Sequence, residues 1–446
     1  MNTQQTDQDK NVKMPQPAQD PRRSRTPRGY TGIALGIILV LLLSIGIYAI
    51  ARFAPESPQT QVTPTAASTA QPTALATTTP AGTDTTPTSA PGVVLGPQAC
   101  PPGIDSTAHW NAIIGTNNGE RAVESVSCAN IMDTPTLQAL VTVRHTNTNR
   151  TLDVYAFNNI TAIHPARIFL LSGLLKGDAQ ISGYNTILTA EVDTHSAVNA
   201  GKPVASMTAD LFREFDWSNA QGTLLQVAFP GIYPDLTRYQ AEADQTRVNQ
   251  GQDSWKNDPV QVAQALAKQF FAWQRPVTGK ILSGGGAHDV SAVVQVQESP
   301  IQGAQVQGPS AVVTLSRLEG NIHNIWIAIA VNDGTMLTLE NIKAGTMLTS
   351  PVRLEGTGAA FEAVIGHAVV YDHLYTDIGH ARITGDNGMG IAHYITNVSY
   401  TSTFQQGAQE GVIAVYEANG GISDEIYTAV LRKALLGPES ALALVG

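Results

Sequence analysis

The stretch TMLTSPVRLEGTGAAFEAVIGHAVVYDHL, residues 346–374, decides how the C-terminal part of the chain is expected to fold. Much of it alternates apolar and polar residues, which is typical of strands that bury one face. Ser350-Pro351 suits the start of a strand at a sheet edge, where the N–H that proline lacks is not needed. Gly356-Thr357-Gly358 is expected to supply a flexible turn into a second strand. The pattern therefore predicts two strands joined at a corner.

Between residues 347 and 436 the chain continues as short strand patterns separated by Gly, Asn and Asp turns. Six or seven strands in about 90 residues are typical of an immunoglobulin-like β-sandwich. The sequence therefore predicts such a sandwich for residues 347–436, followed by a tail at 437–446.

This layout resembles the immunoglobulin-like domain of bacterial spore germination. The matching positions are Ser350-Pro351, Gly356, Phe361-Glu362 at the opening of a long second strand, residues 411–416, Asn419-Gly420-Gly421 and residues 427–431. The segment 387–404 departs from the family pattern, because it is longer and lacks a Gly-x-Phe. The resemblance implies an extracytoplasmic binding or assembly module of the cell envelope, linked to sporulation or germination, and it does not imply an enzyme.

The N-terminal part contains a candidate membrane anchor. Residues 30–51 carry no charged side chain, and a helix of this length spans roughly 33 Å, enough to cross a bilayer core. Arginines at 22, 23, 25 and 28 precede this run, and only Arg52 follows it closely, which places the N-terminus in the cytoplasm. We therefore expect a basic cytoplasmic tail at 1–29 and a single transmembrane helix at 30–52. Ala49-Ile50-Ala51 resembles a signal-peptidase site, which leaves cleavage of the anchor open.

The chain beyond the anchor is expected to lie outside the membrane. Residues 53–97 are rich in Thr, Pro and Ala, a composition that cannot bury a core and that predicts a disordered stalk. Cys100 and Cys128 are the only cysteines, and in an oxidising compartment they are expected to form a structural disulfide. This disulfide is expected to stabilise a β-rich domain over residues 98–255.

Two kinds of pattern follow in the middle of the chain. Strand patterns at 137–145 and 151–160 flank a turn and predict a hairpin, and the patterns on either side of 176–178 predict another in the same manner. A helix is expected after Asp235, with that residue as its N-cap, and a better defined one after Asp258. Strand patterns then continue, so residues 256–346 predict a helix-on-sheet α+β domain. The fold class expected for the whole chain is multidomain and mainly β with α+β.

Charge and motifs narrow the function. The whole chain has a net charge of −10, and the tail at 1–29 carries +3, so the remainder is acidic, which argues against a nucleic-acid partner. No nucleophile elbow, zinc-binding His-Glu-x-x-His or phosphate-binding loop occurs. We therefore expect no catalytic residues, no metal site, no cofactor and no enzymatic activity.

Aromatic residues supply the candidate ligand contacts. Tyr233 and Tyr239 flank a Pro-Asp turn and are less firmly placed in apolar patterns than Trp273 or Trp326, so they are candidates for contact with a ligand such as a sugar. The sequence thus predicts a single-pass cell-membrane protein that binds an envelope polymer or protein outside the membrane. Two alternatives stay open: a cell-wall enzyme with its site in 98–346, and a surface sensor that signals through the short cytoplasmic tail.

Overall fold

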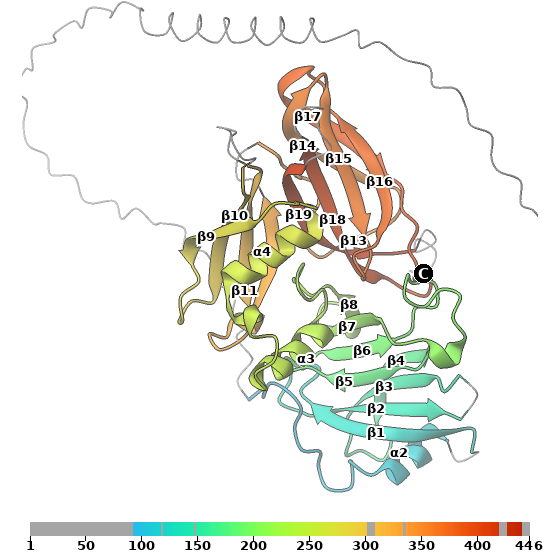
Figure 1. The fold of residues 1–446 in the computed structure, drawn as a ribbon. Coiled ribbons are helices and arrows are strands. Elements are labelled where there is room, and N and C mark those ends of the chain that lie inside the picture. Colours follow the sequence, from blue (N-terminus) through green and yellow to red (C-terminus); the bar gives the residue numbers. More distant parts are fainter. Residues whose placement is uncertain are drawn as a thin grey trace, which may run out of the picture. The chain divides into compact units, whose positions relative to one another are not determined.

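Antiparallel strands form most of the regular structure in the computed structural model, which describes residues 92–116, 119–146, 149–300, 308–332, 336–418 and 426–438 (Figure 1). The mainly β prediction is confirmed. The expected tail at 1–29, the expected transmembrane helix at 30–52 and most of the expected stalk lie outside the described residues. Within the described ranges no helix has the length and apolar character needed to cross a membrane.

The first two sheets contain four strands each. One has the order β1 (Arg121–Ala129), β2 (Gln138–His145), β3 (Leu152–Asn158) and β4 (Ala166–Leu174), and the other β5 (Asp178–Ile181), β6 (Ile187–Glu191), β7 (Leu211–Ser218) and β8 (Thr223–Val227). One apolar core joins the two sheets, with Leu140, Val154 and Ala156 from the first and Ile187, Phe215 and Leu224 from the second. The predicted hairpin at 137–160 is confirmed as β2–β3.

The predicted hairpin around 176–178 is wrong, because β4 pairs with β3 and β5 pairs with β6. Lys176 has a positive φ of 47°, and a Cβ at Gly177 would lie 2.5 Å from the Cβ of Leu174. This tight turn carries the chain from one sheet into the other. Strand patterns flank a turn in the same way whether the turn closes a hairpin or passes from one sheet to another. The sequence therefore could not distinguish these two arrangements.

The outer face of the first sheet is covered by helix α2 (Thr107–Ile114). Trp110 is fully buried there, and its ring lies 4.8 Å from the ring of Phe157, centroid to centroid. The predicted disulfide Cys100–Cys128 is confirmed and ties the segment before α2 to strand β1. Helix α3 (Arg238–Asn249) contacts β6 and β7 of the second sheet. Its N-cap is Thr237 rather than the expected Asp235, because the Thr237 side chain accepts a hydrogen bond from the Gln240 N–H.

A third sheet begins with four consecutive strands, β9 (Val277–Gly284), β10 (Ser291–Glu298), β11 (Ser310–Arg317) and β12 (Trp326–Asn332). Helix α4 (Pro259–Phe270) packs on them and, as predicted, starts at Asp258, whose carboxylate accepts from the N–H groups of Val260 and Gln261. Short 3-10 helices complete this region and the loops before it: η1 (Val204–Ser206), η2 (Ser254–Asn257) and η3 (Leu318–Gly320).

The third sheet continues into the C-terminal region. Its remaining strands are β13 (Thr346–Leu348), β14 (Val352–Phe361), β15 (Val364–Tyr371), β16 (Asp377–Thr384), β17 (Met389–Val398), β18 (Gln409–Ala418) and β19 (Ile426–Leu436). Strand β19 pairs with β12 through Val331 and Leu431, and one core holds the apolar faces of α4, β9–β12 and β18–β19. The regions expected at 256–346 and 347–436 therefore share a sheet and a core.

The stretch 346–374 folds differently from the expected corner. Gly356 and Gly358 lie inside β14, where a Cβ at Gly356 would be only 2.1 Å from the carbonyl oxygen of Thr338. The glycines therefore let the segment at 338–340 lie alongside the strand rather than form a turn. The real turn is Glu362-Ala363, with φ of 51° and 64°, so Phe361 closes β14 instead of opening the second strand. A second core lies between two groups of strands. The pair β14 and β17 lies on one side, and β15, β18 and β19 lie on the other.

Candidate functional site

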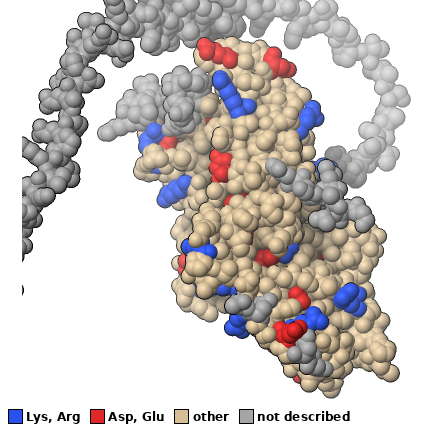
Figure 2. Space-filling model, turned by 90° about the vertical axis from the view of Figure 1, so that its right-hand side faces the viewer, with Lys and Arg blue, Asp and Glu red and all other residues tan. Residues whose placement is uncertain are grey.

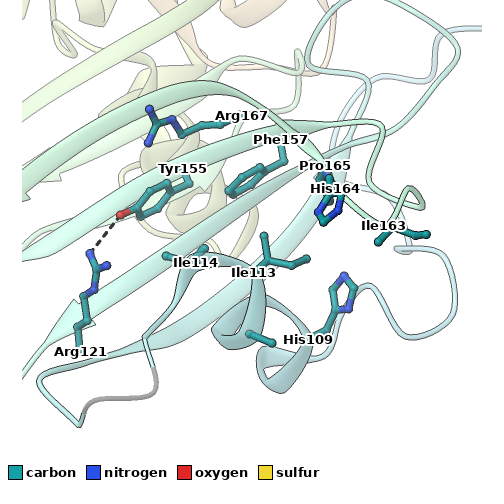
Figure 3. Close-up of a pocket in the computed structure, with 11 residues that line it drawn as sticks. His109, Ile113, Ile114, Arg121, Tyr155, Phe157, Ile163, His164, Pro165 and Arg167 are labelled. Carbon is teal, nitrogen blue, oxygen red and sulfur yellow. Dashed lines mark hydrogen bonds between the residues drawn. The ribbon is translucent and has the colours of Figure 1, made fainter.

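A groove of about 820 Å³ lies on the outer face of the first sheet, beside helix α2. Figure 3 shows its lining side chains, which come from α2, from β1, β3 and β4, and from the loop between β3 and β4. The lining residues are His109, Ala112, Ile113, Ile114, Arg121, Tyr155, Phe157, Ile163, His164, Pro165 and Arg167. We refer to this site as the α2 groove.

The floor of the α2 groove is aromatic. Tyr155 and Phe157 are two positions apart on β3, so both point to the same face of the sheet. Their rings are nearly parallel, with centroids 6.0 Å apart, and the Trp110 ring of α2 packs against Phe157. Both residues are largely buried, and this packing holds the floor in place.

One end of the groove carries two arginines. Arg121 on β1 donates a 3.4 Å hydrogen bond to the Tyr155 hydroxyl and lies 3.8 Å from the Asp153 carboxylate. Arg167 is exposed on β4, directly opposite Phe157 in the strand register, and has no ion pair with any described residue. In Figure 3 the Arg121 guanidinium faces the Tyr155 hydroxyl, and Arg167 lies on the other side of Tyr155.

Two histidines lie at the other end of the groove in Figure 3, His109 from α2 and His164 from the loop before β4. The Nε2 atom of His109 is buried and has no hydrogen-bond partner among the described residues. No Asp or Glu occurs among the described residues that line the groove. The site therefore presents cationic and hydrogen-donating groups around an apolar floor.

The wider surface makes this local charge notable. In Figure 2 the Lys and Arg side chains are interspersed with Asp and Glu side chains on a face that is otherwise mostly uncharged. The chain as a whole carries a net charge of −10. A groove with two arginines and no acid among its described lining residues is therefore a locally basic feature of a chain that is acidic as a whole.

A smaller cavity of about 110 Å³ lies between the chain after β6 and the segment 404–406. Its lining includes Glu191, Asp193 and His195, and one carboxylate oxygen of Asp193 is buried without a hydrogen-bond partner among the described residues. No group of three His, Cys, Asp or Glu side chains in the described ranges is arranged to hold a metal ion. The structure therefore assigns no metal ligands.

The two tyrosines singled out from the sequence lie elsewhere. Tyr233 is half-buried beside Trp255 and Tyr375, with ring centroids 6.5 Å and 6.2 Å away, and its backbone pairs with Ala328. Tyr239 lies on α3, where its hydroxyl donates a 3.0 Å hydrogen bond to the Asp178 carboxylate. Burial, together with Asp178, raises the pKa of Tyr239 to about 12. Neither tyrosine lines the α2 groove.

Sequence reasoning missed the groove residues because they come from four separate elements. The usable signal was weak: a Tyr and a Phe on one face of the strand at 152–158, followed by a basic residue at Arg167. That pattern also fits an ordinary buried strand face. Comparison with known protein families, curated proteins and solved structures finds no match for the chain. The chemistry of the groove therefore carries the functional argument.

Proposed function

We propose that this protein is an extracytoplasmic binding protein of the bacterial cell envelope, and that the α2 groove is its binding site for an anionic envelope component. The observation that carries this proposal is that Arg121 and Arg167 both line an aromatic-floored groove that has no acid among its described lining residues. Guanidinium groups bind carboxylate and phosphate oxygens with two parallel hydrogen bonds, which makes arginine well suited to such recognition.

The rest of the chain gives this site a place in the cell. The segment at 30–52, with its uncharged run at 30–51, would anchor the protein as a single-pass membrane protein, and the Thr- and Pro-rich stretch at 53–97 would carry the binding part away from the bilayer. The pair β14 and β17 packs against β15, β18 and β19 around the second core. This two-layer packing supports an immunoglobulin-like module related to that of spore germination. Such a module would serve assembly at the envelope.

Binding is favoured over catalysis by the groove's chemistry. Its described lining has two histidines, yet no Ser, Cys, Thr or Lys nucleophile and no carboxylate to orient a base. The alternative of a cell-wall enzyme would need those groups at another place in 98–346. A surface sensor would need a cytoplasmic partner for the tail at 1–29.

The test is co-sedimentation of the purified full-length chain with isolated bacterial cell envelopes, with soluble fragments analysed in the same tube. The double variant Arg121→Gln/Arg167→Gln is compared with Arg353→Gln/Arg382→Gln, which removes the same charge from exposed positions on β14 and β16. Saturable binding that the first variant loses and the second keeps supports the proposal. Equal binding by all three proteins would refute the groove as the site, and released fragments would identify an enzyme.

A further inference from the structure

The side chains that line the α2 groove include few uncharged polar groups, and this limits the class of ligand that it can bind. The described lining contains no Ser, Thr, Asn or Gln, and its one hydroxyl, on Tyr155, already accepts a hydrogen bond from Arg121. A hydroxyl-rich ligand such as a sugar chain needs side chains of these types to replace the water it gives up on binding. The groove therefore does not favour a hydrophilic polyanion.

Apolar side chains form the walls instead. Ile113 of α2 lines one side, Phe157 the floor, and Ile163 of the β3–β4 loop the opposite side, where it is 89% exposed. A single exposed isoleucine needs no explanation. Here the exposed isoleucine lines the same groove as other apolar groups, so a ligand in the groove would remove it from water.

The acidic group has a defined place at one end of these walls. The Arg121 guanidinium donates to the Tyr155 hydroxyl and lies 3.8 Å from the Asp153 carboxylate, which also pairs with His145, and Arg167 has no counter-ion among the described residues. Because Arg167 lies opposite Phe157 in register, an acid bound there has the aromatic floor directly beside it. The apolar walls thus lead away from the cationic end.

We propose that the α2 groove binds an amphiphilic anion, with its acidic head at Arg121 and Arg167 and its apolar chain along Ile113, Phe157 and Ile163. This inference rests on the proposed function and narrows the envelope component to a phosphate- or carboxylate-headed lipid or lipid-linked compound. The groove's volume of about 820 Å³ falls within the range of roughly 300–1,000 Å³ that is usual for small-molecule sites in proteins.

Four probes separate the head from the chain: hexyl phosphate, hexanoate, inorganic phosphate and hexanol. Each is titrated calorimetrically into the full-length chain held in nanodiscs of neutral phosphatidylcholine, with empty nanodiscs as the blank. Hexyl phosphate or hexanoate should bind at least about tenfold more tightly than either single-feature probe, since burying several methylene groups is worth more than one factor of ten. The preferred acid of the two identifies the head group.

Two variants locate the contacts. Ile163→Ser should weaken hexyl phosphate by up to about tenfold and leave inorganic phosphate unchanged, whereas Ile395→Ser, at an exposed isoleucine on β17, should change neither. Arg121→Gln/Arg167→Gln should abolish the preference for hexyl phosphate over hexanol.

The outcomes that overturn the inference are distinct from those that overturn the proposed function. Inorganic phosphate binding as tightly as hexyl phosphate would refute the amphiphile and keep an anion-binding groove. Hexanol binding as tightly as hexyl phosphate, or no binding by any probe, would refute both.

Discussion

The ammonium group of Lys433 on β19 lies 3.2 Å from the carboxylate of Glu410 on β18, and both side chains are buried. Lys433 also donates to the carbonyl oxygen of Leu236, and Glu410 accepts from the Phe229 N–H at 3.2 Å. Burial raises the pKa of Glu410 to about 7 even though Lys433 acts against this rise, and burial lowers the pKa of Lys433. Through these contacts the pair links the segment that follows β8, at Phe229 and Leu236, to strands β18 and β19 of the third sheet.

Replacing one member of this pair should be costly. Lys433→Met leaves Glu410 as an unpaired buried acid, and we expect the free energy of unfolding to fall by about 3–5 kcal/mol. Without Lys433 the folded state favours protonated Glu410, so the loss should be smaller at pH 5 than at pH 8. Urea denaturation of the wild type and of Lys433→Met at both pH values measures this difference in the free energy of unfolding.

The control for this prediction is the double variant Lys433→Met/Glu410→Gln. It removes both charges and keeps a hydrogen-bond acceptor for the Phe229 N–H, so it should regain most of the lost stability. An equal loss in Lys433→Met at both pH values, or no recovery in the double variant, would contradict the assignment of a coupled buried pair.

His373 predicts a second pH dependence. Burial alone would lower the pKa of this imidazole, but Asp210, 3.7 Å away, together with Asp372 and the 2.7 Å hydrogen bond to Gln409, raises it above the usual value. The stability from this group is then complete below the unfolded pKa of about 6.5 and is lost as the pH rises through the folded pKa. We expect the unfolding free energy to decrease between about pH 6 and pH 8.

The variant His373→Gln should flatten this decrease, because it removes the group that takes up the proton. His380→Gln is the matched control, since the His380 side chain is 77% exposed, and it should leave the pH profile unchanged. Chemical denaturation across the pH range gives the profiles. If His373→Gln kept the full wild-type slope, the titrating group would lie elsewhere.

Gly356 tests the reinterpreted strand β14. In Gly356→Ala the new Cβ would lie 2.1 Å from the Thr338 carbonyl oxygen and 2.8 Å from the Tyr394 hydroxyl oxygen, so the adjoining segment must move. We expect a loss of about 1–3 kcal/mol in the free energy of unfolding, as for other overpacking substitutions. Gly388→Ala, where no described atom lies within 4 Å, should be nearly neutral. A neutral Gly356→Ala would instead favour the flexible turn.

The disulfide should stabilise the first sheet. Cys100 and Cys128 are 28 residues apart, and in the chain-entropy model closing such a loop contributes about 3–4 kcal/mol. Cys100→Ala/Cys128→Ala should lower the free energy of unfolding by about this amount. A reducing agent should destabilise the wild type and leave the variant unchanged, and an equal effect on both would refute the role of the disulfide.

Local features of this chain were determined by the sequence itself. Helix α4 has its N-cap at Asp258 because a carboxylate cap, a proline at the first helical position and an apolar stripe all lie between Asp258 and Phe270. The β2–β3 hairpin and the Cys100–Cys128 pair follow in the same way from neighbouring residues and from the count of two cysteines. Each depends on interactions that span a short length of chain.

Tertiary structure alone decided the rest. The pairing of β12 with β19 joins Val331 to Leu431, 100 positions apart, and alternation on either strand does not name its partner. Gly356 reads as a turn residue until the segment at 338–340 packs against it. The α2 groove brings His109, Arg121 and Arg167 together from three elements. Apolar burial selects these long-range contacts only when the whole core forms, so no local pattern could reveal them.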